Sequence, residues 1–219
     1  MQKIVIVGAG GFACEVLDIV MAQNAISPQY EFVGFIDENR AHWGMVLNGH
    51  PVLGGFEWFE TQDKAQIQVT CAVGNPAVRQ ELVEKASALG LRFCTITHPT
   101  AVLTPFVKLG EGVIITAGCI LTNRIKVGNH VHLNLDCTIG HDAIMDDFAT
   151  LAPGVHVSGW VFLRKRVYVG TGAVIINGTQ EEPVIIGDDA VIGAGACVIG
   201  SVSEGLTVVG VPAKPLPRS

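Results

Sequence analysis

The sequence predicts an α/β domain followed by a parallel β-helix, and two observations support this division. Residues 1–97 alternate short apolar runs with segments of helical periodicity, which is typical of a small parallel sheet with helices between its strands. From Leu103 onward, an aliphatic residue returns at every sixth position. Neither an α-helix nor an alternating strand has that period, whereas a parallel β-helix does. We therefore expect two domains, residues 1–97 and 98–219, with His98 and Pro99 at the hinge.

The opening segment KIVIVGAGGFACEVLDIV, residues 3–20, predicts a strand at 3–7, a glycine-rich turn, and a helix at 11–23. The glycines of the turn are Gly8, Gly10 and Gly11. Backbone amides at such a helix N-terminus favour a pyrophosphate. The dinucleotide-binding fingerprint is incomplete, because Ala13 replaces its last glycine and the domain is long enough only for a mononucleotide-binding half, a half-Rossmann unit. A nucleotide sugar is therefore favoured over NAD and over a purely structural turn.

The rest of the first domain is expected to contain three more strands and one more helix. The strands are expected at 31–37, 68–74 and 91–97. The helix is expected from Pro76 to about Leu89, with Asn75 as its N-cap and Gly90 as its terminator.

Polar residues at the ends of these strands are candidates for nucleotide contacts. Asp37 ends the second strand, where an acidic residue can meet a ribose or a base edge. Gly74 and Asn75 end the third strand beside the same crevice, and Arg79 lies one helical turn further along. Two simpler roles remain open: Asn75 as the helix cap and nothing more, and Arg79 as a solvated charge on the helix.

The second domain is predicted to wind three hexads into each triangular coil of 18 residues. The lead aliphatics are expected to fill the interior, and the residues two and three places later to lie near the corners. The leads are Leu103, Leu109, Ile115, Leu121, Val127, Leu133, Ile139, Met145, Leu151, Val157, Leu163, Val169 and Ile175. The phase breaks at residues 177–183 and resumes at Ile186, so a loop is expected to leave one corner there. The C-terminal VVGVPAKPLP, residues 208–217, is expected to cap the open end.

Composition and charge exclude several classes of function. The formal net charge of the 219 residues is −6, and the basic residues do not cluster, so neither a nucleic-acid surface nor an electrostatic membrane anchor is indicated. No apolar run reaches the roughly 18 residues of a membrane span, and no secretory signal opens the sequence. The six cysteines contain no CxxC motif, which fits buried thiols in a reducing compartment. We expect a cytoplasmic protein with no nucleic-acid or membrane partner.

Five motifs in a fixed order carry a resemblance to a known family. They are GAGG, GFIDE, AVGN followed by an arginine, IGHDAxxxDF and GVPAK. Over essentially its whole length the sequence resembles the sialic-acid O-acetyltransferases and the bacillosamine- and perosamine-type N-acetyltransferases, which are hexapeptide-repeat acyltransferases. The resemblance implies a left-handed coil, a homotrimer, and acetyl transfer from acetyl-CoA to an amino group of a nucleotide-linked sugar. It also implies that the first domain holds the nucleotide sugar and that acetyl-CoA lies between neighbouring coils.

His141 is the candidate general base. It follows the lead residue Ile139 by two places, which predicts a position at a coil corner that faces solvent or another subunit. An amine that attacks a thioester must lose a proton, and histidine suits that task near neutral pH. The resemblance implies that Asp142 orients this ring and that Asn134 lies near the reacting centre. The simpler alternatives are a surface histidine and an asparagine that stabilises a coil turn.

The resemblance assigns further residues to the two substrates. Phe12 and Thr150 stand where some relatives carry histidine; Phe12 is expected to pack on the sugar or base, and Thr150 can still donate a hydrogen bond. Gly159, one coil after His141, is a candidate amide donor to the thioester oxyanion. The nucleotide-sugar candidates are Gly8, Gly10, Gly11, Phe12, Asp37, Gly74, Asn75 and Arg79. The acetyl-CoA candidates are Thr150, Gly159, Gly170, Thr171, Gly193, Ala194, Pro212 and Lys214.

Three functions remain open on the sequence. The leading one is N-acetylation of a nucleotide-linked 4-amino-4,6-dideoxyhexose, with GDP favoured over UDP or dTDP. The alternatives are O-acetylation of a sugar such as sialic acid, and a non-catalytic solenoid that binds a sugar nucleotide. A catalytic metal is not expected, because the histidines of the coil are never five residues apart, the spacing found in zinc-dependent coils of this repeat.

Overall fold

The computed structural model describes residues 1–216, and the chain divides into two compact units after Pro99. The division falls two residues beyond the boundary expected from the sequence, directly after the His98–Pro99 pair. Among the described residues, no helix is both long and apolar enough to cross a bilayer.

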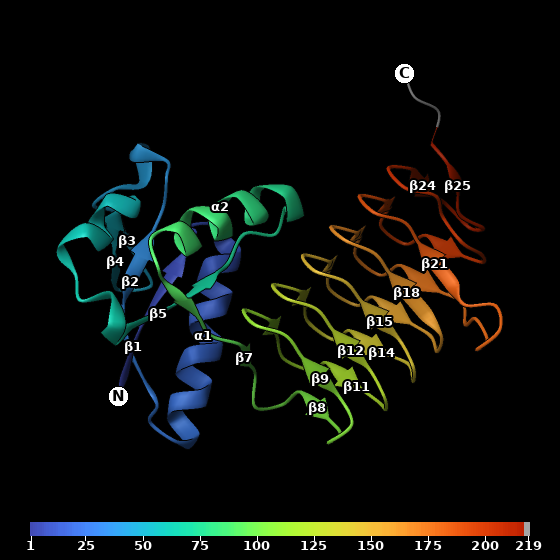
Figure 1. The fold of residues 1–219 in the computed structure, drawn as a ribbon, viewed down its shortest axis with the longest axis horizontal. Coiled ribbons are helices and arrows are strands. Elements are labelled where there is room, and N and C mark those ends of the chain that lie inside the picture. The colour runs from blue at the N-terminus through green and yellow to red at the C-terminus, as the bar shows by residue number, and fades with distance from the viewer. Residues whose placement is uncertain (217–219) are drawn as a thin grey trace. The chain divides into compact units, whose positions relative to one another are not determined.

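The first unit is built around a six-stranded sheet in the order β3-β4-β2-β1-β5-β6 (blue to green in Figure 1). All neighbouring strands are parallel except β3, which pairs antiparallel with β4. The elements of this unit are β1 (Gln2–Val7), α1 (Gly11–Ile26), β2 (Tyr30–Ile36), η1 (Arg40–His42), β3 (Val46–Leu47), β4 (His50–Gly54), η2 (Phe56–Thr61), η3 (Lys64–Gln66), β5 (Ile67–Cys71), α2 (Pro76–Ala88), β6 (Arg92–Phe93) and β7 (Ile96–Thr97).

Both helices expected in this unit form. Helix α1 buries Ala13, Val16, Leu17 and Val20, whose spacing places them on one face. Helix α2 begins as predicted, because Asn75 Oδ1 accepts hydrogen bonds from the backbone N–H groups of Ala77 and Val78.

Two parts of the first unit differ from the sequence prediction. The expected strand at 91–97 is interrupted, and it forms β6 and β7 with Cys94 and Thr95 between them. The segment between β2 and β5, for which no element was predicted, contains β3, β4 and three short 3-10 helices. Strand β4 extends the sheet by pairing with β2, so this side of the sheet depends on tertiary contacts rather than on local periodicity.

The second unit is a three-sided parallel β-helix whose coils are stacked along one axis (green to red in Figure 1). Its strands are β8 (Val102–Leu103), β9 (Lys108–Leu109), β10 (Ile114–Ile115), β11 (Ile120–Leu121), β12 (Lys126–Val127), β13 (His132–Leu133), β14 (Thr138–Ile139), β15 (Ile144–Met145), β16 (Thr150–Leu151), β17 (His156–Val157), β18 (Val161–Leu163), β19 (Tyr168–Val169), β20 (Val174–Ile175), β21 (Val184–Ile186), β22 (Val191–Ile192), β23 (Cys197–Val198), β24 (Thr207–Val209) and β25 (Lys214–Pro215). Every third strand pairs in parallel register, as in β8-β11-β14-β17-β20-β23 and β9-β12-β15-β18-β21.

The lead aliphatics occupy the interior, as the six-residue period predicts. Eleven of the thirteen belong to the buried core, and Leu103 and Leu109 pack partly buried against its N-terminal end. Each fully buried aliphatic side chain contributes roughly 1.5–3 kcal/mol relative to an exposed one. Because the interior provides the stability, the corners are free to carry other residues.

The corners repeat one backbone conformation. The residue three places after a lead often has a positive φ, as at Arg124 (φ 51°), Asp142 (φ 61°) and Trp160 (φ 56°). This is the left-handed region, in which glycine, asparagine and aspartate are the most tolerated residues. We call the turns at residues 105–106, 123–124, 141–142 and 159–160 the His141 corner. The turns at residues 153–154, 171–172 and 194–195 are called the Thr171 corner.

The interruption at residues 177–183 forms a loop at the His141 corner, as predicted (orange, beside β21 in Figure 1). The loop is anchored where Gly178 N–H donates to the carbonyl of Gly159 and Val184 N–H donates to that of Trp160. Beyond the loop, Ile186 pairs with Leu163 and restores the register.

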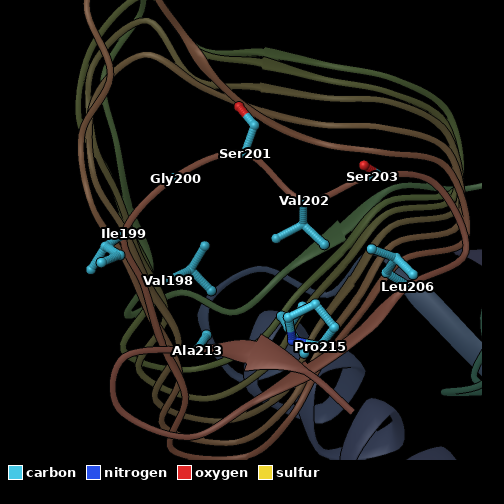
Figure 2. A pocket seen from close by; sticks show the side chains of 10 residues that line it. Val198, Ile199, Gly200, Ser201, Val202, Ser203, Leu206, Ala213 and Pro215 are labelled. Carbon is cyan, nitrogen blue, oxygen red and sulfur yellow. The ribbon is translucent and has the colours of Figure 1, made fainter. Parts of the chain in front are cut away.

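The C-terminal segment closes the last coil. Strand β25 turns back to pair antiparallel with β24. Ala213 and Pro215 lie across the end of the prism beside Val198 and Val202, around a cavity of about 290 Å³ (Figure 2). The predicted cap is therefore formed up to Leu216, whereas Pro217 lies outside the described residues.

Candidate active site

The His141 corner places an imidazole and a carboxylate together on the surface of the coil. Strand β14 points Ile139 into the core, and the chain then turns at His141 and Asp142. His141 Nδ1 lies 2.8 Å from Asp142 Oδ2, and the His141 side chain is 58% exposed. Because an ionised carboxylate can only accept, Nδ1 carries a proton, and in the neutral ring the lone pair is therefore on Nε2.

A third residue, Arg124, completes the cluster from one coil earlier. Its Nε donates to Asp142 Oδ1 and its Nη2 to Asp142 Oδ2, each at 2.7 Å. The hydrogen bonds from Arg124 are the largest cause that lowers the pKa of Asp142, to about 2, and the bond from His141 acts in the same direction. Asp142 is therefore ionised throughout the neutral range. Sequence reasoning missed Arg124, although the 18-residue coil places this cation directly next to Asp142.

Gly159 lies against the ring of His141 on the side of the next coil. A Cβ atom on Gly159 would lie 2.8 Å from His141 Cε1 and 2.9 Å from Nε2. The predicted proximity of these two residues is therefore present in the fold. The absence of a side chain at position 159 leaves room for the imidazole beside the Gly159 backbone.

A hollow of about 350 Å³ lies beside the same corner, toward the N-terminal end of the coil. Pro105, Phe106 and Arg124 contribute to it from the His141 corner, and Lys108 and Lys126 from the adjacent face. The hollow therefore combines an apolar wall with three cationic side chains.

Asn134 does not lie at the His141 corner. It directly follows β13, its side chain is largely buried, and the turn at 135–136 and strand β14 separate it from His141. Its backbone carbonyl accepts hydrogen bonds from the Cys119 thiol (3.1 Å) and from Cys137 N–H (3.3 Å).

The predicted acetyl-CoA residues occupy more than one side of the coil. Gly159 belongs to the His141 corner, whereas Gly170, Thr171, Gly193 and Ala194 follow β19 and β22 at the Thr171 corner. A Cβ on Gly170 would lie 2.6 Å from the Ala194 nitrogen, so these small residues stack closely. Thr150 is buried within β16, and Pro212 and Lys214 are exposed in the C-terminal cap.

The first unit contains a cavity of about 190 Å³ at the ends of its parallel strands. Gly8 and Asp37 are among its lining residues, together with Glu38 and Phe56. The glycine-rich turn is held by the carboxylate of Asp37, whose Oδ2 accepts from Ala9 N–H at 2.9 Å. Gly8 has φ 113°, and a Cβ there would approach the Ala72 carbonyl to 3.0 Å, so this position requires glycine.

The remaining glycines of the turn are open to a ligand. Nothing lies within 4 Å of a Cβ built on Gly10 or Gly11, and the same holds for Gly74 beyond β5. Gly10 is the N-cap residue of α1 and provides no side-chain cap. Phe12, in the first turn of α1, is half-buried.

Arg79 corrects one of the simpler interpretations. It is fully buried instead of being a solvated helix charge, and its Nη1 donates to the carbonyl oxygens of Val73 (2.7 Å) and Gly74 (3.2 Å). Burial lowers the pKa of Arg79 to about 10. Arg79 therefore fixes the backbone of residues 73–74 through these hydrogen bonds.

Among residues 1–216, no group of three or more histidine, cysteine or acidic side chains is arranged to hold a metal ion. The six cysteines are all free thiols.

The fold and the site together define a hexapeptide-repeat acyltransferase with an added α/β domain, and comparisons with known proteins agree. Residues 3–86 match the family model described as the PglD N-terminal domain. The chain is 33% identical over 216 residues to GDP-perosamine N-acetyltransferase of Escherichia coli O157:H7. The aligned region covers 98% of this chain and 96% of that protein.

Two solved structures are similar over the whole chain. WeeI from Acinetobacter baumannii AYE has a TM-score of 0.91 at 36% identity and covers 99% of this chain and 100% of its own. The second is a histidine mutant of perosamine N-acetyltransferase from Caulobacter crescentus, solved with CoA and GDP-perosamine. It has a TM-score of 0.90 at 28% identity, and the match covers 100% of this chain and 98% of that chain. The chain therefore belongs to the family of nucleotide-sugar N-acetyltransferases, and the resemblance inferred from its motifs is confirmed.

Proposed function

We propose that this protein transfers the acetyl group of acetyl-CoA to the 4-amino group of a GDP-linked 4-amino-4,6-dideoxyhexose, with His141 as the general base. The observation that carries the proposal is the exposed His141 imidazole, bonded through Nδ1 to an ionised carboxylate. GDP-perosamine, which the perosamine N-acetyltransferase structure contains, is such a substrate. The nucleotide sugar is held by the first unit and acetyl-CoA by the coils.

The reaction is a direct attack without an acyl-enzyme intermediate. The sugar amine nitrogen attacks the thioester carbonyl carbon while His141 Nε2 removes the amine proton. The tetrahedral intermediate then collapses, the carbon–sulfur bond breaks, and the CoA thiolate leaves and is protonated. Asp142 stabilises the imidazolium that forms, and we assign the oxyanion to the Gly159 backbone N–H. Holding the two substrates together supplies up to roughly 7–11 kcal/mol of the barrier reduction.

A homotrimer would complete the site. Gly159 and the acetyl-CoA candidates at the Thr171 corner lie on different corners of one coil, so a groove between neighbouring copies is needed to bring them together. The sheet that contains β14 also presents exposed apolar side chains for such packing. They are Val102, Ile120, Val174, Ile176 and Ile199. We assign the reaction to the cytoplasm, whose reducing conditions suit the six free thiols.

The lining of the cavity in the first unit favours a guanine nucleotide as the ligand. Its polar lining includes the carboxylates of Asp37 and Glu38, and a carboxylate can accept hydrogen bonds from the N–H groups of a guanine edge. The apolar lining, which includes Phe56 and Val78, suits the faces of a base.

A substrate panel tests the proposal. The purified protein is incubated with acetyl-CoA and GDP-, UDP- or dTDP-linked 4-amino sugars, and thiol release is followed together with the mass of the sugar nucleotide. We expect release only with an amino sugar and a product heavier by one acetyl group, with the GDP-linked sugar turned over fastest. Acetylation of sialic acid but of no amino sugar would replace the proposal with sugar O-acetylation. Nucleotide-sugar binding without any thiol release would indicate a non-catalytic binding protein.

A further inference from the structure

We infer that Arg124 is a positioning residue for acetyl transfer: its guanidinium fixes the Asp142 carboxylate, and this carboxylate in turn orients the His141 imidazole. The inference rests on the proposed role of His141 as general base. It adds to the site a residue from the coil before the one that carries the base.

The geometry supports a positioning role. Arg124 meets Asp142 with both ends of its fork, through Nε to Oδ1 and Nη2 to Oδ2, and a bidentate pair fixes the plane of a carboxylate as well as its position. With that plane fixed, Oδ2 is directed at His141 Nδ1, 2.8 Å away. Without the bidentate contact, the carboxylate plane of Asp142 can take a broad range of orientations, because its χ2 torsion has no sharp staggered minima.

The ring itself has little else to hold it. The His141 side chain is 58% exposed, so packing restrains it weakly, whereas that of Asp142 is only 11% exposed. The contact with Gly159 restricts the ring on one side but cannot choose between its two nitrogens. The carboxylate makes that choice, and Arg124 determines where the carboxylate points.

Stability alone does not account for this ion pair. The Arg124 side chain is 65% exposed, and screening by solvent limits what such a pair contributes to stability. The chain also contains a second pair with the same contact geometry that lacks a neighbouring histidine. Arg166 and Asp189 both have positive φ and form the same two-pronged contact across one coil, but Asp188 precedes the aspartate there. This second pair is the control for what such a contact contributes to the fold.

The test compares Arg124→Gln with Arg166→Gln in the full-length protein. We expect Arg166→Gln to lower the unfolding temperature at least as much as Arg124→Gln, because the Arg166 side chain is 27% exposed and that of Arg124 is 65% exposed. Arg124→Gln should lower kcat about tenfold, with the KM values of both substrates within about twofold of wild type, whereas Arg166→Gln should keep kcat. Equal kcat values for the two variants would overturn the inference. Arg124→Lys, which keeps the charge but not the fork, should recover only part of the loss.

A double-mutant cycle separates positioning from a general effect of charge. In an Asp142→Asn background, Arg124→Gln should cause little further loss of kcat, because the two residues act as one unit. Full additivity of the two losses would show that Arg124 acts elsewhere and would refute the inference.

Histidine tautomers provide a readout that needs no turnover. In ¹⁵N-histidine spectra, the neutral His141 ring should be predominantly protonated at Nδ1 in wild type and in Arg166→Gln, and should become a tautomer mixture in Arg124→Gln. An unchanged tautomer in Arg124→Gln would reject the inference even if the enzyme is active. If the tautomer shifts but wild-type protein acetylates no amino sugar, the proposed function fails while the positioning by Arg124 stands.

Discussion

Gly159 and His141 are in contact across two neighbouring coils, and the contact depends on the absence of a side chain at position 159. A methyl group there would lie 2.8 Å from His141 Cε1 and 2.9 Å from Nε2, closer than van der Waals contact allows. The backbone φ of Gly159 lies outside the left-handed region. Space for the imidazole is therefore the structural requirement at this position.

Gly159→Ala should displace the ring and lower kcat about tenfold or more while changing stability little. The atoms nearest to the added methyl belong to the exposed His141 side chain, which can swing into solvent. Gly200→Ala is the matched control, since Gly200 also follows its lead residue by two places and a Cβ there meets nothing within 4 Å. Steady-state kinetics and thermal unfolding of both variants test this relationship, and equal activity of the two alanine variants would contradict it.

His141→Asn should lower kcat by roughly 10²–10⁴, the usual loss when a general base is removed. The fold should remain intact because the side chain is largely exposed and its backbone carbonyl still accepts from Trp160 N–H. His156→Asn is a suitable control, because His156 is an exposed histidine on the neighbouring strand that bonds Thr138 Oγ1. Near-wild-type turnover of His141→Asn, measured by thiol release, would show that the base is another residue.

The coil could be predicted in detail because its period is set by packing. Each lead aliphatic such as Ile139 must face the interior, so the phase of one repeat determines the phase of the next, and it also places His141 at a corner. The segment between β2 and β5 carries no such period. Strand β4 forms only because β2 offers a free edge, which no local pattern indicates.

The part of the site that lies on the periodic coil was predictable, whereas the part that depends on tertiary contacts was not. His141, Asp142 and Gly159 follow from the 18-residue coil, and Arg124 could have been found by applying the same step backwards from Asp142. Arg79 was harder to interpret, since a charge near a helix start is usually solvated. Its burial depends on the carbonyl oxygens of Val73 and Gly74, which only the fold brings to it.

Asp142→Asn should show a stability difference from wild type that depends on pH. The pKa of Asp142 is lowered to about 2 in the folded protein, chiefly by Arg124, so its carboxylate stabilises the fold above the pKa of the unfolded chain. That contribution is lost as the pH falls from about 5 toward 2, when the folded protein also takes up the proton. The gap in unfolding temperature between wild type and Asp142→Asn should therefore shrink over this range.

Asp189→Asn provides the control, because Arg166 lowers the pKa of Asp189 in the same way. It should show the same pH trend in unfolding temperature but leave kcat unchanged at neutral pH, where Asp142→Asn is impaired. A gap for Asp142→Asn that stays constant from pH 6 to pH 2.5 would contradict the assigned ion pair.

Residues 98–219, produced alone, should form a trimer that binds acetyl-CoA but not the nucleotide sugar. The prediction follows from the division of the chain into two compact units, each with its own buried core, and from the cavity proposed for the nucleotide, which lies entirely within the first. Sedimentation analysis measures the assembly, and calorimetric titration measures the two affinities.

The full chain with Gly11→Trp is the complementary variant, since nothing lies within 4 Å of a Cβ at that position and an indole there would fill the space at the start of α1. This variant should remain folded and bind acetyl-CoA normally while losing affinity for the GDP-sugar. If residues 98–219 bind the nucleotide sugar as tightly as the full chain, the first unit does not hold it, and the assignment of the glycine-rich turn to the sugar nucleotide is wrong.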